Sequence, residues 1–476
     1  MKAVEAETVS RPGYSTGLET LEAEVDLDSL PIDGAIPEWL TGTLLRNGPA
    51  RFEVGEQPLL HWFDGLAMLH KFSFVGGRVS YANRFLRSGA YRAAQDGRIS
   101  YSEFATDPCR SIFKRAATMF RPRLTDNCNV NLTRLGDEYV AMTETPLPIA
   151  FDPETLETLG VAFKPPGIHA TAHPHHDPER NELVAYVTHF GARSEYRIFA
   201  QRDRATQRRI ASLRAAEPSY MHSFALTERY AVLVAFPLVV NPLSLAFSGR
   251  PFIENYRWKP ELGTRVLVFD REDGELQGKY MAEPRFSFHH VNAFERDGEL
   301  VIDMVAYDDA TIIDSLYMDR LRAAPPSESS YGKLLRYRVG LDSGDVREEE
   351  LSDEILELPR IDYRERNGRS YRYVYAAGSR DDGDAPDFID QLVKVDVETG
   401  EAQRWFEPGS YPGEPVFVPA PQPDRAEDDG VLLSVVLDSR SAASYLLVLD
   451  AANLEELGRA RVPHHIPFGF HGQYFS

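Results

Sequence analysis

Short stretches of alternating apolar and polar residues recur along the chain, and each runs into a turn. Three of them are residues 265–270 before Asp273-Gly274, residues 335–339 before Asp342-Ser343-Gly344, and residues 393–396 before Glu398-Thr399-Gly400. Alternation with a period of two is typical of half-buried strands, and turns rich in Asp and Gly between such runs indicate β-hairpins. The pattern therefore predicts an all-β protein.

The spacing of these turns narrows the architecture. Asp342, Asp396 and Asp450 follow one another at equal intervals of 54 residues. A period of about fifty residues is typical of one four-stranded propeller blade per repeat, while an antiparallel sandwich built from hairpins is the alternative. No Gly/Ser-rich linker divides the chain, so we expect residues 1–476 to form a single β-propeller domain with insertions.

Two apolar segments interrupt the strand pattern. Residues 109–120 have apolar side chains at helical spacing and basic side chains on the other side, which predicts an amphipathic helix. Residues 236–247 are apolar but contain Pro237 and Pro242. Each segment fits either a plain core or a membrane-facing patch, because basic residues beside apolar ones suit an interfacial site.

Composition excludes several classes of function. The chain of 476 residues carries 52 basic and 73 acidic side chains, a net charge of −21, which argues against nucleic-acid binding. Its only cysteines, Cys109 and Cys128, exclude a disulfide scaffold and fit a reducing compartment. The first residues lack the apolar core of a signal peptide, and no apolar run approaches the roughly 18 residues of a membrane span. We therefore expect a cytoplasmic protein.

Histidines are the strongest chemical signal in the sequence. Four clusters contain His173 with His175 and His176, His222, His289 with His290, and His471. A shell of histidines suits zinc, copper, iron or nickel, although a lone buried histidine is more often an ordinary core residue. No local ligand spacing decides between these readings. A propeller, however, brings the inner strands of all its blades to one axis, where distant histidines can meet.

Three glutamates stand in apolar, strand-like contexts: Glu144, Glu357 and Glu414. A buried carboxylate needs a partner, and a metal-binding histidine usually donates its second ring N–H to a carboxylate or a carbonyl. The alternative for each glutamate is a strand end that faces water.

Taken together, these motifs resemble a known family. Residues 34–49, residues 61–65 and the terminal Phe470-His471-Gly472, with the histidine and glutamate motifs between them in order, are similar to the carotenoid cleavage oxygenases. This non-haem iron family includes the vertebrate retinoid isomerase. The resemblance implies a seven-bladed β-propeller with a dome of helices and loops over the iron centre.

The resemblance also implies a ligand set and a reaction. The motifs assign Fe(II) to His173 rather than His175 or His176, to His222, to His289 rather than His290, and to His471. Glu144, Glu357 and Glu414 match the carboxylates that orient three of the four histidines, and which glutamate serves which histidine stays open. The implied reaction uses O2 as co-substrate and splits a C=C bond of a long apolar substrate into two carbonyl products.

The same resemblance gives the two apolar segments a role. They match the parts of the family that dip into membranes to collect lipid-like substrates. We therefore expect peripheral membrane contact in an otherwise cytoplasmic protein, through the residues Ile112, Phe113, Lys114, Leu243, Leu245 and Phe247.

Two positions of the implied catalytic site bear on the substrate. Stilbene-cleaving members bind a phenol with a lysine and a tyrosine, and the corresponding positions here are Thr143 and Phe120. Neither residue supports a phenolic substrate, so we expect a carotenoid or an apocarotenoid. Central 15,15′ cleavage to retinal is the favoured reaction. A retinoid isomerase, a stilbene-cleaving enzyme and a propeller that binds an apolar pigment without turnover are the alternatives.

Overall fold

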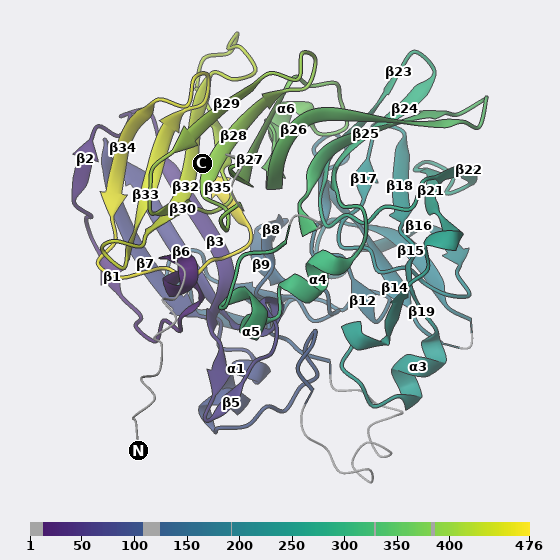
Figure 1. Ribbon diagram of the computed structural model, residues 1–476, viewed down its shortest axis with the longest axis horizontal. Helices are drawn as coiled ribbons and strands as arrows, with labels where there is room; N and C mark the ends of the chain where they lie inside the picture. Colours follow the sequence, from purple (N-terminus) through teal and green to yellow (C-terminus); the bar gives the residue numbers. More distant parts are fainter. Residues whose placement is uncertain (1–12, 108–123, 192, 328–329, 382–385) are drawn as a thin grey trace, which may run out of the picture.

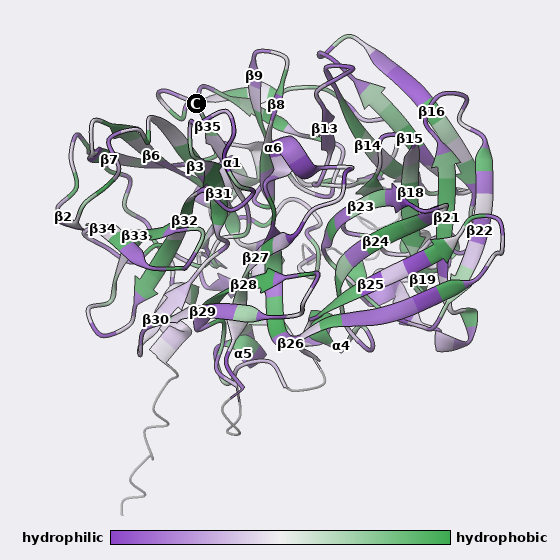
Figure 2. Ribbon diagram, turned by 90° about the horizontal axis from the view of Figure 1, so that it is seen from above, coloured by the Kyte–Doolittle hydropathy of each residue, from purple (hydrophilic) through white to green (hydrophobic). Residues whose placement is uncertain are grey.

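Seven β-sheet blades stand around a common axis in the computed structural model, which describes residues 13–107, 124–191, 193–327, 330–381 and 386–476. Figure 2 looks down on the blades, which radiate from the centre of the molecule. The predicted all-β, seven-bladed propeller is confirmed by this arrangement.

We number the blades along the chain, beginning with the blade that contains the first long strand. From the axis outward, blade 1 contains β35 (Gly472–Phe475), β3 (Gly42–Arg51), β6 (Leu66–Val75), β7 (Arg78–Phe85) and β1 (Asp26–Leu27). Blade 2 contains β8 (Asn131–Leu135), β9 (Glu138–Met142), β10 (Ile149–Phe151) and β11 (Thr158–Val161). Blade 3 contains β12 (His169–Ala170) and β13 (His175–Asp177), then β14 (Glu182–His189), β15 (Glu195–Gln201) and β16 (Gln207–Arg214). Blade 4 contains β17 (Ala225–Leu226), β18 (Tyr230–Ala235), β21 (Thr264–Asp270) and β22 (Leu276–Ala282).

One long strand joins blades 5 and 6 into a single seven-stranded sheet. Blade 5 contains β23 (His290–Arg296), β24 (Glu299–Ala306), β25 (Lys333–Gly340) and the first part of β26 (Val346–Arg360). The second part of β26 then pairs with β27 (Tyr373–Ser379), which is followed by β28 (Gln391–Asp396) and β29 (Ala402–Phe406). The strand β26 is therefore outermost in one blade and innermost in the next.

The ring closes by pairing strands from opposite ends of the sequence. Blade 7 contains β30 (Ser410–Pro412) and β31 (Val416–Pro419), then β32 (Gly430–Asp438), β33 (Ala443–Asp450), β34 (Glu456–Arg461) and β2 (Ile32–Gly34). In blade 7, β2 pairs with β34, and in blade 1, β35 pairs with β3, with Arg46 opposite Gly472. Strands from the two ends of the chain therefore complete the first and last blades, and this closes the ring.

Burial along the strands follows their position in a blade. The middle strands β14 and β24 are buried almost throughout, because a neighbouring blade packs on each of their faces. The outer strands β16 and β22 alternate or are mostly exposed. Separate apolar clusters fill the spaces between blades, such as the cluster of Tyr186, Phe224 and Leu267 between blades 3 and 4. The two-residue alternation therefore marks outer strands best.

The repeated aspartate turn has a fixed place in the fold. Asp342, Asp396 and Asp450 stand at the turn between the third and fourth strands of blades 5, 6 and 7. The side chains of Asp396 and Asp450 accept hydrogen bonds from backbone N–H groups two residues further on, as Asx turns do. Asp270, Asp203 and Asp152 occupy the same turn in blades 4, 3 and 2 at unequal intervals.

Insertions between strands build a dome on one face of the propeller. It includes the helices α1 (Gly89–Gln95), α3 (Pro242–Phe247), α4 (Thr311–Ser315) and α5 (Met318–Leu321), and the short pairs β4 (Glu53–Val54) with β5 (Gln57–Pro58) and β19 (Leu238–Val240) with β20 (Tyr256–Trp258). The 3-10 turns are η1 (Gly13–Leu18), η2 (Trp62–Asp64), η3 (Ile253–Asn255) and η4 (Pro260–Leu262). In Figure 1 the dome helices lie at the lower side, while α6 (Tyr363–Arg366) lies on the opposite face.

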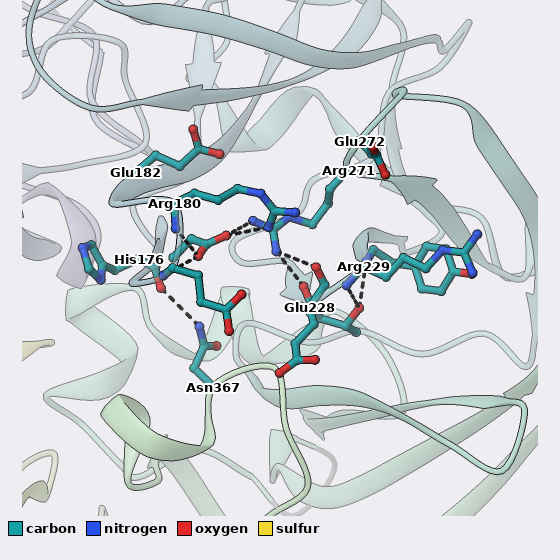
Figure 3. A network of polar contacts seen from close by, with 12 residues as sticks. His176, Arg180, Glu182, Glu228, Arg229, Arg271, Glu272 and Asn367 are labelled. Carbon is teal, nitrogen blue, oxygen red and sulfur yellow. Dashed lines mark hydrogen bonds and ion pairs between the residues drawn. The ribbon is translucent and has the colours of Figure 1, made fainter.

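A buried ion pair fastens blades 3 and 4 near the α6 face. The carboxylate of Asp177, at the end of β13, accepts hydrogen bonds from the guanidinium groups of Arg271 and Arg180. Arg271 also donates to the backbone oxygens of Thr227 and Glu228, 2.9 and 3.1 Å away (Figure 3). Because both Asp177 and Arg271 are buried, removing Asp177 would leave the Arg271 guanidinium without a compensating charge between the blades.

Candidate metal centre

Four histidines from four blades meet on the propeller axis. His173 lies between β12 and β13, and the other three stand shortly before the innermost strands of blades 4, 5 and 1: His222, His289 and His471. One nitrogen from each ring lies within 4.8 Å of the others. The Nε2 atoms of His173 and His222 are 2.9 Å apart, and those of His289 and His471 are 3.2 Å apart. The structure thus brings together the four histidines that the sequence selects.

The hydrogen bonds of these rings leave their inner nitrogens free to bind a cation. His289 and His471 each direct Nδ1 at a carboxylate oxygen, 2.5 and 2.8 Å away, so a neutral ring donates from Nδ1 and keeps a lone pair on Nε2. Two such lone pairs facing each other repel unless a cation lies between them. The donor set of four imidazole nitrogens therefore fits a transition-metal ion, iron among them.

Each of the three glutamates serves one histidine. Glu144 Oε1 lies 2.8 Å from Nδ1 of His222, Glu357 bonds to His289, and Glu414 bonds to His471. Among the described residues His173 has no carboxylate partner. The three glutamates come from blades 2, 6 and 7, so each of the seven blades contributes either one histidine or one glutamate to the centre.

The carboxylates have additional partners that sequence reasoning missed. The hydroxyl of Tyr220 donates to Glu144 at 3.0 Å, and the hydroxyl of Tyr307 donates to Glu357 at 2.7 Å. Glu414 instead lies 3.7 Å from a guanidinium nitrogen of Arg360. Tyr220 stands two residues before His222, and Arg360 stands three residues after Glu357, but only the folded ring shows that they contact the glutamates.

Burial and neighbouring charges set the pKa values of the centre. Burial lowers the pKa of His471 to about 4, although Glu414 raises it, so the ring is neutral at pH 7. Burial lowers the pKa of His173 well below its usual value, and the other three histidines lower it further. Burial raises the pKa of Glu414, but Arg360, His471 and Arg46 outweigh burial and bring that pKa to about 2. Neutral rings and an ionised glutamate are the protonation states that a cation site needs.

An apolar cavity of about 820 Å³ adjoins the histidines on the dome side. Its wall includes His222, His289 and His471 together with many aromatic rings, among them Trp62, Phe63, Phe104, Phe252, Phe288 and Phe470. Phe63 packs against Phe104, Phe288 and Phe470, with ring centroids 5.2 to 5.8 Å apart. We call this space the apolar cavity. It suits a long hydrocarbon that lies beside the metal centre.

One acidic residue in the cavity wall is another that the sequence did not single out. Glu103 is 8% exposed, and its Oε1 accepts a hydrogen bond from Thr125 Oγ1 at 2.7 Å. Burial raises the pKa of Glu103 well above its usual value, and the nearby carboxylate of Asp64 adds to the effect. The raised pKa favours the neutral form of Glu103 over the charged one in this apolar wall.

A second space reaches the centre from the α6 face. This space of about 1500 Å³, which we call the polar vestibule, is lined by His173, His289 and His471 and by Arg360, Tyr363 and Glu414, among other polar residues. Most of its charged groups are paired, as in the ion pair of Arg366 with Glu427 at 3.1 Å. The histidine centre thus lies between an apolar space and a polar one.

The remaining predicted site residues fall into two groups. Thr143 lines the apolar cavity beside Glu144, while Phe120 lies outside the described residues, as do Ile112, Phe113 and Lys114. On α3, Leu243 and Phe247 are 64% and 67% exposed, whereas Leu245 is half-buried and packs against the main core. Within the described ranges, no helix is both long enough and apolar enough to span a bilayer.

Comparison with known proteins gives one consistent result. The family model described as retinal pigment epithelial membrane protein matches residues 18–476. The carotenoid isomerooxygenase of Galleria mellonella is 37% identical over 93% of this chain and 92% of its own. The mitochondrial carotenoid-cleaving dioxygenase of Mustela putorius furo is 34% identical over 96% of both chains. The beta,beta-carotene 15,15′-dioxygenase of Gallus gallus is 32% identical over 98% of both chains.

Solved structures agree with the sequence relatives. Cobalt-substituted Synechocystis ACO superposes with a TM-score of 0.88 over 98% of both chains, at 28% identity. A chimera of ACO and RPE65 gives the same TM-score and coverage at 27% identity.

Proposed function

Because the chain belongs to the carotenoid cleavage oxygenase family and is a dioxygenase of that family, we propose that it uses Fe(II) and O2 to cleave a C=C bond of a carotenoid or apocarotenoid. The observation that carries this proposal is the convergence of four imidazole nitrogens beside an aromatic cavity. The products are two aldehydes, or an aldehyde and a ketone, that together contain both atoms of O2.

In this proposal His173, His222, His289 and His471 hold the iron, and Glu144, Glu357 and Glu414 hold three of those histidines. When bound, Fe(II) supplies the one-electron chemistry that lets O2 react with a closed-shell alkene. The protein's own residues do the rest. Each carboxylate accepts the Nδ1 proton of its histidine, which fixes the tautomer and aims the Nε2 lone pair at the centre. The aromatic wall excludes water from the reacting bond.

The favoured reaction is central 15,15′ cleavage of β-carotene to retinal. Relatives that carry the name beta,beta-carotene 15,15′-dioxygenase support it, as does a cavity whose surface is mostly apolar. Thr143 offers the cavity a hydroxyl where a phenol-binding enzyme needs an ammonium group, which argues against a stilbene. Relatives named carotenoid-cleaving dioxygenase and carotenoid isomerooxygenase keep cleavage at another double bond and isomerisation as the second candidates.

The test is an aerobic incubation of Fe(II)-loaded protein with β-carotene, an apocarotenal and a hydroxystilbene, with the products identified by mass spectrometry. We expect retinal from β-carotene and no retinal from a His289→Ala control. A different apocarotenal product would show that another double bond is cleaved. Hydroxybenzaldehydes alone would overturn the substrate class, and no product from iron-loaded protein would favour isomerisation or binding without turnover.

We also propose that the dome rests on a membrane at the mouth of the apolar cavity. Leu243 lines the cavity and is exposed, and Phe247 is exposed on the same short helix. Two large apolar side chains in water beside a hydrocarbon-binding space favour a lipid surface. Ile112, Phe113 and Lys114, which lie outside the described residues, are proposed to join this surface.

Liposome co-sedimentation tests the membrane proposal. Leu243→Asp and Phe247→Asp should each move the protein from the pellet to the supernatant. Leu159→Asp is the matched control, because Leu159 is 62% exposed on β11, the outer strand of blade 2. Equal partitioning of all three variants with the unmodified chain would contradict the proposal.

A further inference from the structure

The three carboxylates that hold histidines differ in what compensates their charge. Glu144 accepts hydrogen bonds from the Tyr220 hydroxyl, and Glu357 accepts them from the Tyr307 hydroxyl and the backbone N–H of Leu358. All of these donors are neutral. Glu414 accepts a hydrogen bond from the backbone N–H of Gly472 at 2.8 Å. Among the described residues it is also the one of the three that faces a cation, since Arg360 Nη1 lies 3.7 Å from the same Oε1 that bonds to His471.

The guanidinium of Arg360 is held in this position by the neighbouring blade. Arg360 is the last residue of β26, and its Nη2 donates to the backbone oxygen of Gly472 at 2.8 Å and to Gln473 Oε1 at 3.2 Å. A second guanidinium, that of Arg46, bonds only to the backbone oxygens of Glu414 and Phe470. Arg360 is therefore the cation that pairs with the Glu414 carboxylate itself.

The physical consequence concerns the strength of His471 as a ligand. A carboxylate that accepts the Nδ1 proton of a histidine makes Nε2 a better electron donor. A cation beside that carboxylate draws its negative charge away and weakens the effect. His222 and His289 keep an uncompensated carboxylate, His471 keeps a compensated one, and His173 has none among the described residues.

We propose that Arg360 is a positioning residue that limits electron donation from His471 to the bound metal ion, through its ion pair with Glu414. Of the four histidines, His471 and His173 are then the weaker donors. Weaker donation favours the lower charge of the metal, so Arg360 favours ferrous over ferric ion. The inference rests on the proposed metal-binding role of the four histidines.

The test compares Arg360→Gln, which keeps a hydrogen-bond donor but loses the charge, with Arg360→Lys, which keeps the charge. Full-length protein is titrated with Co(II), following the visible absorption bands of the bound ion, and the Fe(III)/Fe(II) potential of the iron-loaded protein is measured. Arg360→Gln should bind Co(II) more tightly, by about tenfold. It should also have a lower potential, since a tenfold stronger preference for ferric ion corresponds to about 59 mV. Arg360→Lys should stay close to the unmodified chain.

The sign of the effect separates this role from a merely structural one. If Arg360 only braces β35, both uncharged variants, Arg360→Gln and Arg360→Met, will bind Co(II) more weakly, and the inference is wrong. Unchanged affinity and potential would also overturn it. Arg461→Gln controls for net charge, because Arg461 pairs with Asp33 at the outer edge of blade 7. If the unmodified chain binds no Co(II), the metal-binding proposal itself fails.

If the uncharged Arg360 variants do not fold, a second pair of variants tests the same inference. Glu414→Gln removes a charge that Arg360 already compensates, whereas Glu357→Gln removes an uncompensated one. Glu414→Gln should therefore raise the Fe(III)/Fe(II) potential less than Glu357→Gln does. An equal or larger rise for Glu414→Gln would contradict the role of Arg360.

Discussion

The apolar cavity and the polar vestibule touch the same histidines yet are built from different parts of the chain. Long insertions between strands, with Trp62, Phe104 and Phe252 among their residues, wall the apolar cavity. The polar vestibule is lined mainly by strand ends and by the segment around α6, whose charges are largely paired. The four histidines thus come from the propeller, while much of the aromatic wall beside them comes from the insertions.

The difference has a chemical meaning. In the proposed reaction, the aromatic wall on one side excludes water and so limits side reactions of the intermediates. The vestibule leaves His173 and His471 in contact with a polar space on the other side. His289 and His471 line both spaces.

Replacement of a shared histidine should have the largest effect. His289 lines both spaces, and His289→Ala removes one imidazole nitrogen and leaves the Glu357 carboxylate without its partner. We expect loss of bound iron and a fall in product formation of at least about a thousandfold, on the order of 4 kcal/mol. Metal analysis and a product assay measure the two losses. Full iron content in this variant would remove His289 from the ligand set.

Acid should destabilise the protein through a buried histidine of the dome. His61, in the dome, is buried; its Nδ1 accepts a hydrogen bond from the Phe63 N–H, and its Nε2 lies 3.0 Å from the Ile313 oxygen. Burial lowers the pKa of His61 to about 3. The unfolded ring takes up a proton near pH 6.5 and the folded ring does not, so stability falls as the pH drops below 6.5.

The expected loss of stability from His61 is on the order of 3 kcal/mol between pH 6.5 and pH 4. Denaturant unfolding of the metal-free protein across this range measures it. In His61→Gln the slope of stability against pH should be smaller, even though the variant is less stable at pH 7. An identical slope would show that other groups, such as the buried His70, account for the acid sensitivity.

A matched pair of substitutions compares the two spaces directly. Phe63→Ala enlarges the apolar cavity beside His222 and should lower kcat/KM by about 10- to 100-fold, or roughly 1.4 to 2.7 kcal/mol. Arg364→Ala removes an exposed side chain of the polar vestibule and should change kcat/KM less than about twofold. Steady-state kinetics on the same substrate gives both values, and equal losses would contradict the division of labour.

The smallest effect is expected at the rim of the blades. Asp396 accepts hydrogen bonds from the backbone N–H of Glu398 and from Arg372 in the turn before β29. Asp396→Ala should lower the free energy of unfolding by about 1 kcal/mol and leave kcat/KM unchanged, because this turn touches neither space. Thermal unfolding beside an activity assay checks both. A change in activity would mean that the outer strands control the axis.

The sequence predicted the propeller because one turn repeats. Asp342, Asp396 and Asp450 stand at equivalent turns of blades 5, 6 and 7. No long insertion separates these three turns, so their spacing stays regular. The same turn holds Asp152, Asp203 and Asp270, but the dome insertions make their intervals unequal, and the period disappears from the sequence. The insertions that form the cavity wall thus make the blade repeat undetectable in the first half of the sequence.

The metal centre was only partly accessible to sequence reasoning. Motifs selected His173, His222, His289 and His471, and the structure places these four together. Their pairing with Glu144, Glu357 and Glu414 depends on the order of blades around the ring, which local spacing does not encode. Tyr220 and Arg360 were missed because their effect reaches the histidines through a carboxylate, and no motif marks such a contact.

The pairing of β3 with β35 sets the order of events when this protein is made. Arg46 meets Gly472 only after more than 400 intervening residues have been synthesised, and His471 directly precedes that last strand. When the three glutamates and the first three histidines of the centre have left the ribosome, the fourth histidine, His471, has still to follow. Assembly of the four-histidine set is therefore tied to completion of the ring, and a chain that stops before His471 holds only three of the four imidazoles.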